Sequence, residues 1–263
     1  MASATPQLTV ERGLGVLRAF RSERAPLSNA ELVRRTGLPK ATVSRLTSTM
    51  LQLGFVRHVG DSRQFELAPG PLGIGHAFLA GSDLLERVNP VLQALADQLE
   101  ASVALGIPDR LDMVYVAYRA GRRVGTLRLG VGSVLPMGRT AIGHAYLWSR
   151  PPRVREPLLQ ALRGQAHAHA AGMERSMRNS FRELDATGTC AVLGLYQRNA
   201  CAVARPVAIG PQRTMVGLSC GKAHLAMDLA TQKQRMSPAV MDTAARLERL
   251  LADFEDVQWN TTP

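Results

Sequence analysis

The chain of 263 residues is poor in cysteine, in aromatic residues and in long apolar runs. Its three cysteines are an odd number for a chain of this length, so we expect Cys190, Cys201 and Cys220 to be reduced thiols rather than a disulfide framework. No apolar run approaches the roughly 20 residues that a helix needs to cross a bilayer. The sequence therefore predicts no membrane-spanning helix and no membrane partner.

The motifs of several common catalytic sites are also missing. There is no Walker loop, no dinucleotide-binding fingerprint and no G-x-S-x-G nucleophile elbow. The N-terminal stretch "MASATPQLTVERG" has no basic start followed by an apolar core, as a secretion signal would have. We therefore expect a cytoplasmic protein that is not an enzyme and that carries no cofactor.

Acidic residues are outnumbered by basic ones, and the excess is uneven. The chain holds 32 Lys and Arg against 21 Asp and Glu, a formal net charge of +11. Residues 1–68 hold ten of the basic residues and five of the acidic ones, so the first quarter of the chain carries nearly half of the excess. This distribution favours a small module that binds a polyanion, placed ahead of a larger domain.

The first 40 residues contain the start and stop signals of helices. Apolar residues at helical spacing predict a first helix over 9–22. Ser28 and Glu31 have the spacing of a capping box and predict the start of a second helix, which Gly37 ends. Pro39 suits the first turn of a third helix.

The third helix runs to Gly54 and is followed by a hairpin. Two strand-like pieces, 55–59 and 64–67, flank the turn residues 60–62, which read Gly-Asp-Ser. Two helices, a short break, a third helix and a hairpin follow one another in the order found in a winged helix-turn-helix.

A helix in the third position of this motif can enter the major groove of B-DNA and present its N-terminal residues to base edges. The alternative is an ordinary amphipathic helix with a solvated basic face. Arg45 can make a bidentate contact with guanine, and Ser28 with the helix amides near it can hold a phosphate. Double-stranded DNA is therefore the expected partner of Ser28, Lys40, Ala41, Thr42, Ser44, Arg45, Arg57 and Arg63.

The rest of the chain mixes helical and strand-like segments. "PGPLGIG" at 69–75 is typical of a linker or hinge, and the helix predicted after Ser82 is kinked or divided at Pro90. The pattern predicts strands at 102–107, 112–118, 123–130, 189–195, 200–209 and 214–221, and helices at 139–149, 153–163, 173–187 and 237–256. Such a mixture predicts an α+β domain.

The stretch "TVERGLGVLRAF…PLSNAELVRRTGLPKATVSRLTSTMLQLGFVRH" resembles the N-terminal domain of the IclR-type transcriptional regulators over roughly residues 8–75. "GSVLPMGRTAIGHAYLW" resembles the later family segment "G-x-x-L-P-x-H-x-T-A-x-G-K-A-x-L", and "VARPVAI…MVGLSCG" resembles its late paired strands. The resemblance implies a winged helix-turn-helix domain at 8–68, a linker helix at 69–82, and a GAF-like α/β effector-binding and oligomerisation domain at 83–256. It also implies a ligand-responsive regulator that binds a roughly palindromic operator as a homodimer or homotetramer, acting as a repressor or an activator.

In the family, a small organic effector binds in a cup on the sheet of the second domain. Positions carried over by the resemblance place Leu135, Met137, Ala141, Ile142, Cys201, Leu218 and Cys220 at this cup. Two acidic positions of the family fall on Val192 and Leu193, and its paired serines fall on Leu218 and Cys220. We therefore expect a small aromatic or apolar effector that is held mainly by burial, with Ser219, Tyr196 or a nearby arginine to orient it.

Two other functions stay open at this point. A redox- or metal-sensing regulator would use the three cysteines, or His167 and His169, although buried thiols and a solvated loop are the simpler interpretation of these residues. An enzyme with a basic N-terminal module would need a catalytic motif that the sequence does not contain. The basic segment 119–128 could contact DNA flanks or a neighbouring subunit, but a solvated hairpin turn is the simpler interpretation.

Overall fold

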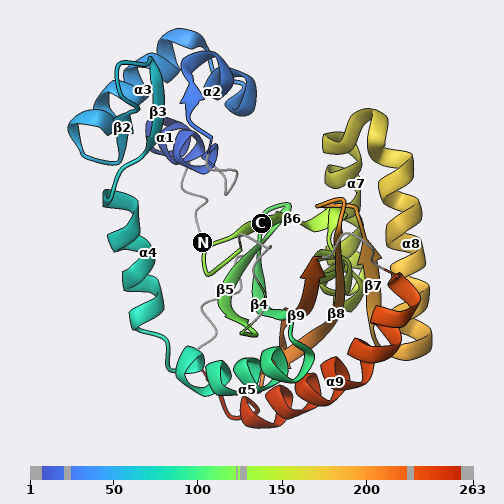
Figure 1. Ribbon diagram of the computed structural model, residues 1–263. Helices are drawn as coiled ribbons and strands as arrows, with labels where there is room; N and C mark the ends of the chain where they lie inside the picture. Colours follow the sequence, from blue (N-terminus) through green and yellow to red (C-terminus); the bar gives the residue numbers. More distant parts are fainter. Residues whose placement is uncertain (1–7, 21–24, 123, 125–128, 224–227, 256–263) are drawn as a thin grey trace. The chain divides into compact units, whose positions relative to one another are not determined.

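The computed structural model describes residues 8–20, 25–122, 124, 129–223 and 228–255. The chain divides into two compact units, Met1–Gly81 and Ser82–Pro263. Each unit has its own buried apolar cluster. The α+β fold class predicted from the sequence is confirmed, with a helix-turn-helix ahead of a mixed helix and strand domain (Figure 1).

The first unit begins with three helices, α1 (Leu8–Arg18), α2 (Asn29–Thr36) and α3 (Lys40–Gln52). The Ser28 side chain caps α2 by accepting a hydrogen bond from the Glu31 amide at 3.2 Å, as the capping-box spacing predicts. Gly37 ends α2 in the left-handed conformation (φ 69°) and donates its amide to the Val33 carbonyl. Pro39 is the N-cap residue of α3, one position ahead of the first turn in which the sequence placed it.

A three-stranded antiparallel sheet completes the winged motif. Its strands, in the order β1-β3-β2, are β1 (Leu27–Ser28), β2 (Val56–His58) and β3 (Gln64–Leu67). The hairpin β2–β3 was predicted, whereas β1 was not, because two residues are too few to show an alternating pattern. The core beneath the sheet contains Val16, Leu32, Val43, Val56 and Phe65.

Residues 69–75, which the sequence pattern assigned to a linker or hinge, belong largely to helix α4 (Gly70–Ala80). Pro69 is the N-cap residue and Pro71 lies in the first turn, where a missing amide hydrogen breaks no helical bond. A Cβ at Gly70 would lie 2.8 Å from the Gly54 carbonyl oxygen. Glycine therefore allows the start of α4 to lie directly against the end of α3.

The second unit is built on a six-stranded antiparallel sheet with the order β6-β5-β4-β9-β8-β7 (Figure 1). The strands are β4 (Ser102–Asp109), β5 (Asp112–Ala120), β6 (Val134–Pro136), β7 (Cys190–Leu193), β8 (Ala200–Ile209) and β9 (Thr214–Ala223). Five of the six predicted strands correspond to observed ones. The predicted strand 123–130 lies largely outside the described residues, as does half of the basic segment 119–128, whose first two residues belong to β5.

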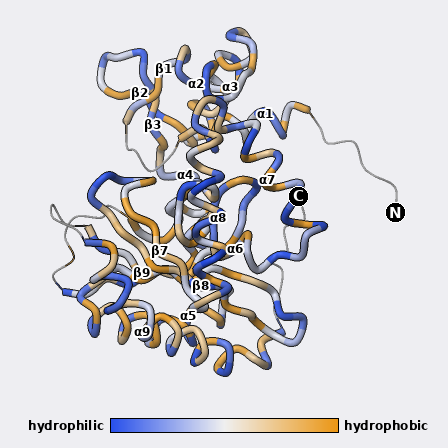
Figure 2. The backbone as a smooth tube through the Cα atoms, turned by 90° about the vertical axis from the view of Figure 1, so that its right-hand side faces the viewer, coloured by the Kyte–Doolittle hydropathy of each residue, from blue (hydrophilic) through white to orange (hydrophobic). Residues whose placement is uncertain are grey.

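Helices cover both faces of this sheet. Helices α5 (Asp83–Leu99) and α9 (Leu229–Leu250) pack on one face, and α6 (Ala141–Ser149), α7 (Pro152–Ala166) and α8 (Ala170–Thr187) form the layer on the other. In Figure 2 the strands β7, β8 and β9 are predominantly hydrophobic, whereas α9 alternates between hydrophobic and hydrophilic residues along its length. The alternation is that of an amphipathic helix with one face on the sheet.

Two further differences from the predicted elements involve prolines inside helices. Pro90 neither ends nor divides α5, which continues through it. The last helix begins at Leu229 rather than at 237, because Asp228 caps it and Pro238 lies inside it. No helix among the described residues is long and apolar enough to cross a membrane.

Candidate nucleic-acid interface and ligand cavity

Helix α3 divides its residues between the core and the surface. Val43, Leu46 and Met50 are buried against the rest of the first unit. The opposite face is exposed. Its exposed residues in the first three turns are Lys40, Ala41, Arg45, Ser48 and Thr49, and Thr42 and Ser44 are half-buried beside them.

The basic side chains of α3 have no ion-pair partner in the described part of the chain, whereas those of α2 do. Among the residues that the structure describes, neither the Lys40 ammonium nor the Arg45 guanidinium makes a hydrogen bond or ion pair. Glu31 in α2 instead binds Arg34 and Arg35, with oxygen–nitrogen distances of 2.6 Å to each. Hydrogen bonds from Arg34 and then Arg35 lower the pKa of Glu31 to about 2.

The wing contains two further residues that the sequence predicts to contact DNA. Arg57 and Arg63 are both exposed, on β2 and in the β2–β3 turn. The Arg57 Nη2 lies 2.7 Å from the Glu66 Oε1 across the hairpin. Ser28 is half-buried, and because its oxygen accepts the Glu31 amide, its hydroxyl hydrogen is still available to a phosphate.

Ser48 and Thr49 are exposed residues of α3 that the sequence interpretation missed. Their hydroxyls donate to the carbonyls of Ser44 (2.9 Å) and Arg45 (3.1 Å). The signal was present in the sequence, because both lie three or four residues beyond Arg45 and so share its helical face.

The second unit contains a cavity between the sheet and the start of α6. Its empty volume, including open solvent at its mouth, is about 560 Å³. The sheet side is lined by Ser102, Ala104, Tyr115, Val192, Ala200, Cys201, Ala202, Ser219 and Gly221. The other side is lined by Leu129, Leu135, Arg139, Thr140, Ala141, Ile142, Leu195, Tyr196 and Gln197.

The structure brings four of the seven predicted effector residues to this cavity: Leu135, Ala141, Ile142 and Cys201. Met137 is buried in the core beside the cavity and does not line it. Cys201 borders the cavity although its side chain is 1% exposed and belongs to the core cluster under α5 and α9.

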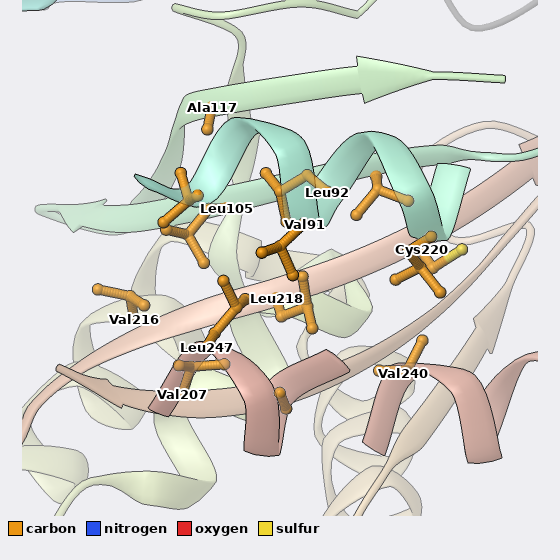
Figure 3. Packing of buried hydrophobic residues seen from close by; sticks show 14 of the residues in the cluster. Val91, Leu92, Leu105, Ala117, Val207, Val216, Leu218, Cys220, Val240 and Leu247 are labelled. Carbon is orange, nitrogen blue, oxygen red and sulfur yellow. The ribbon is translucent and has the colours of Figure 1, made fainter. Parts of the chain in front are cut away.

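Leu218 and Cys220 do not line the cavity. Figure 3 shows both side chains on the opposite face of the sheet, among residues of α5 and α9. Successive residues of a strand point to opposite faces, so a one-residue difference in register exchanges every side chain between the two layers. On β9 the cavity-facing residues are therefore Ser219 and Gly221.

Ile142 holds the start of α6 close to the sheet. A Cβ at Gly217 would lie 2.3 Å from the Ile142 Cγ1, and one at Gly106 would lie 2.8 Å from its Cδ1. These two glycines create the space into which Ile142 packs. They fix α6 at the edge of the cavity.

The cavity is not wholly apolar, because several hydroxyls and one guanidinium reach it. The Ser219 hydroxyl hydrogen-bonds to the Tyr115 hydroxyl, and burial raises the pKa of Tyr115. Arg139 donates from Nε and Nη2 to the Leu195 carbonyl at 3.0 and 2.6 Å. Ser219, Tyr196 and an arginine were predicted to orient a ligand and all line the cavity, whereas Ser102, Tyr115 and Gln197 were missed.

The three cysteines are free and buried. Burial raises the pKa of Cys190 and that of Cys220 to about 12, and it raises the pKa of Cys201 as well. His167 and His169 are exposed in a short 3₁₀ turn, η2 (His167–His169). Within the described part of the chain, no three His, Cys, Asp or Glu side chains gather in a way that could hold a metal ion.

Comparison with known proteins finds a matching family model for each of the two units. Residues 9–60 match the IclR helix-turn-helix domain, and residues 76–249 match the bacterial transcriptional regulator IclR C-terminal domain. The HTH-type transcriptional regulator TsaQ1/TsaQ2 of Comamonas testosteroni is 35% identical over 159 residues, which are 60% of this chain and 57% of that protein. This chain thus spans less than two thirds of that relative.

Two solved structures share the fold. An IclR family transcriptional regulator from Brucella abortus is 29% identical with a TM-score of 0.79, over 95% of this chain and 96% of that one. An IclR homologue from Microbacterium hydrocarbonoxydans, solved in complex with 4-hydroxybenzoate, has a TM-score of 0.60 at 18% identity, over 92% and 98% of the two chains. Because the C-terminal match alone covers more than half of the sequence, the chain belongs to the IclR family of bacterial transcriptional regulators, whose members are not enzymes.

Proposed function

We propose that this protein is a ligand-responsive regulator whose first unit binds operator DNA through α3. The observation that carries the proposal is the exposed face of α3, where Lys40 and Arg45 have no partner among the described residues. Arg45 reads a guanine, and Ala41, Thr42 and Ser44 contact neighbouring bases or their methyl groups. A chromosomal operator also implies the cytoplasm as the site of action.

Other residues hold the DNA backbone and carry no sequence information. Arg57 and Arg63 on the wing are exposed cations next to the path of the duplex, and Ser28 offers a hydroxyl at the N-terminus of α2. Helix N-termini favour anions because their first amides have no partner in the helix. These contacts position α3, so their loss weakens binding to all sequences alike.

The second unit takes a small aromatic ligand in the cavity beside α6. Leu135, Ile142 and Val192 supply apolar surface, which stabilises a buried ring by about 25 cal/mol per Å². The sequence predicts an aromatic or apolar effector. Because polar groups also line the cavity, we propose that this effector carries hydrogen-bonding substituents. Tyr115 and Ser219 suit a ligand hydroxyl.

An anionic substituent fits the other end of the cavity. Arg139 is the one charged residue among the described residues that line it, and two of its hydrogens remain on Nη1 when Nε and Nη2 bind Leu195. Thr140 caps α6 by accepting the Gly143 amide, which leaves the first-turn amides of Ala141 and Ile142 unpaired in the helix. A carboxylate here would gain from both the guanidinium and the helix N-terminus.

Apolar surface on the first unit supports our proposal of a homodimer, or of a tetramer built from dimers. Large apolar side chains of α1 and α4 are exposed, and Val10 with Leu14, like Ile74 with Phe78, are spaced four residues apart on one helical face. The exposed fractions are Leu8 55%, Val10 55%, Leu14 54%, Leu72 75%, Ile74 62% and Phe78 49%. Ile74→Glu should dissociate the oligomer in analytical ultracentrifugation, whereas Leu53→Glu, a change at an equally exposed leucine outside α1 and α4, should not.

The organisation proposed is a DNA-binding domain at 8–68, a linker at 69–82 and an effector and oligomerisation domain at 83–256. Ligand and operator must then influence each other by the same factor in affinity. No observation favours a redox or metal sensor, since the thiols are buried with raised pKa values.

Titration of the purified protein with 4-hydroxybenzoate, benzoate, pyruvate and glyoxylate tests the cavity. We expect the aromatic acids to bind more tightly than the keto acids, and Tyr115→Phe to weaken 4-hydroxybenzoate more than benzoate. Arg139→Gln should weaken both aromatic acids equally. Tighter binding of glyoxylate or pyruvate than of either aromatic acid would refute the aromatic assignment.

A further inference from the structure

His144 on α6 is a buried histidine that neither the DNA interface nor the cavity uses directly. Its side chain is 0% exposed. The Nδ1 lies 2.8 Å from the Ser180 Oγ in α8, and the Nε2 lies 3.0 Å from the Gly138 carbonyl oxygen. Gly138 belongs to the 3₁₀ turn η1 (Met137–Arg139), so one ring connects three elements of the second unit.

The two partners determine where the ring carries its proton. A carbonyl oxygen can only accept, so Nε2 bears the hydrogen and donates to Gly138, and Nδ1 accepts from the Ser180 hydroxyl. Burial lowers the pKa of His144 to about 4. The imidazole is therefore neutral at neutral pH and both hydrogen bonds are present.

The two hydrogen bonds of His144 join it to two different parts of the second unit. On one side, Gly138 directly precedes Arg139 and Thr140, which line the cavity. On the other side, Ser180 lies on the buried face of α8 and does not line the cavity. The imidazole is thus the link between the backbone of the cavity wall and a helix behind it.

The wall and α8 are also packed tightly at this point. A Cβ at Gly138 would lie 2.5 Å from the Met173 Sδ, so α8 contacts the bare backbone of η1. Cys190 on β7 is a titratable neighbour of α6, and its Sγ donates to the Ala141 carbonyl oxygen at 3.5 Å. Because its thiol pKa is raised to about 12, this neighbour is uncharged as well.

We propose that His144 is a positioning residue that ties the wall segment Gly138–Thr140 to Ser180 of α8 and so fixes Arg139 and Thr140 at the cavity. The inference rests on the proposed function, in which this cavity binds the ligand. It goes beyond that function by making ligand affinity depend on a hydroxyl that does not line the cavity. Loss of either hydrogen bond allows the wall segment to shift. The shift weakens the binding of an anionic group by Arg139 and Thr140 more than it weakens apolar contacts with the ligand.

The tautomer of His144 gives a direct spectroscopic test in the full-length protein. Long-range ¹⁵N–¹H correlation spectra distinguish the protonated from the bare ring nitrogen, and His144→Gln identifies the signal among the six histidines. We expect an Nε2–H ring that does not titrate as the pH passes through 6.5. A ring protonated on Nδ1, or one that titrates near 6.5, would overturn the proposal.

Hydrogen exchange of residues 137–143, which include the wall segment, tests the positioning itself. Ser180→Ala, which removes one hydrogen bond, should speed exchange there by about tenfold, and His144→Leu, which removes both, should speed it by at least as much. His144→Gln should restore slow exchange, because the amide can donate to Gly138 and accept from Ser180. Ser176→Ala, the matched control at a half-buried serine of the same helix, should change nothing. Equal exchange in the Gln and Leu variants, or an unchanged Ser180→Ala, would contradict the role of His144.

Ligand affinity completes the test. Ser180→Ala should weaken 4-hydroxybenzoate severalfold and weaken phenol, which lacks the carboxylate, much less. An equal loss for both ligands would overturn the proposal. If neither compound binds the wild-type protein, the assignment of the cavity to aromatic ligands fails, while the tautomer and exchange measurements still decide the role of His144.

Discussion

Arg57 and Glu66 occupy directly paired positions of β2 and β3, and their charged groups meet 2.7 Å apart on the surface of the wing. Their side chains are 67% and 38% exposed. Exposed ion pairs contribute only about 0–1 kcal/mol to stability. If Arg57 holds the DNA backbone as we propose, a phosphate can replace the Glu66 carboxylate at little cost, and Glu66 would act as a weak competitor of the DNA backbone.

Substitutions at this pair should change DNA affinity without changing sequence preference. Arg57→Ala should weaken binding to operator and random DNA alike, and should reduce the slope of log K against log salt by about 1. Glu66→Gln should strengthen both at low salt, because it frees the Arg57 cation, and this gain should vanish at high salt. Fluorescence anisotropy across a salt titration measures both effects. A loss confined to the operator for Arg57→Ala would assign it to base reading instead.

Substitutions at two neighbouring residues of β9 should have opposite effects on stability and on ligand affinity, because the two side chains face opposite helical layers. Leu218 is fully buried under α5 and α9, so Leu218→Ala should lower the free energy of unfolding by about 2–5 kcal/mol and leave ligand affinity nearly unchanged. Ser219→Ala removes one hydrogen bond to Tyr115, costs about 1 kcal/mol of stability, and should alter the affinity for 4-hydroxybenzoate. Urea unfolding and ligand titration of the two variants check the assignment. The reverse pattern would mean that the strand faces are exchanged.

The three thiols should be inert in the folded protein. Burial raises the pKa of Cys190 and Cys220 to about 12, so the reactive thiolate is scarce throughout the physiological range. We expect no reaction with a disulfide reagent until the protein is unfolded, and no effect of diamide on DNA binding. A rapidly reacting thiol in the native state would restore a redox sensor as a candidate.

Stability should decline in mild acid because of His144. Its pKa falls from an ordinary value of 6.5 in the unfolded chain to about 4 in the folded protein. The unfolded state therefore binds more protons between these values, and this contribution, complete above pH 6.5, is lost as the pH falls toward 4. Urea unfolding at a series of pH values should give a shallower decline for His144→Gln. Identical pH profiles for the two proteins would show that the imidazole is not buried in its neutral form.

The winged motif could be predicted almost entirely from the sequence, because its signals are local. Ser28 and Glu31 lie three residues apart in one turn, and Gly37 ends α2 through its own backbone conformation. Strand β1 was missed because it exists only through pairing with β3, a contact with residues far along the chain. Helix α4 was missed as a pattern because glycine and proline suggest a break unless their place in the first turn is known.

The cavity was only partly predictable, because its residues meet through the sheet register. Leu135, Ala141 and Ile142, which the resemblance placed at the cup, fall in one continuous segment, and all three line the cavity. Leu218 and Cys220 depend on which residues of β9 face α6, and a shift of one residue reverses that answer. Tyr115 and Ser102 lie on strands without any motif, so only the three-dimensional arrangement identifies them.

Selection of binding sites from random duplex DNA tests the central claim most directly, that α3 reads operator bases through Arg45. The wild-type protein should enrich a pseudo-palindromic sequence whose half-sites contain one strongly preferred guanine, with half-sites spaced by whole helical turns. Arg45→Ala should relax the preference at that guanine alone, by about 1–3 kcal/mol, while Lys40→Ala leaves it intact. Failure of the wild-type protein to enrich any sequence, or equal losses of Arg45→Ala on selected and random DNA, would contradict the account.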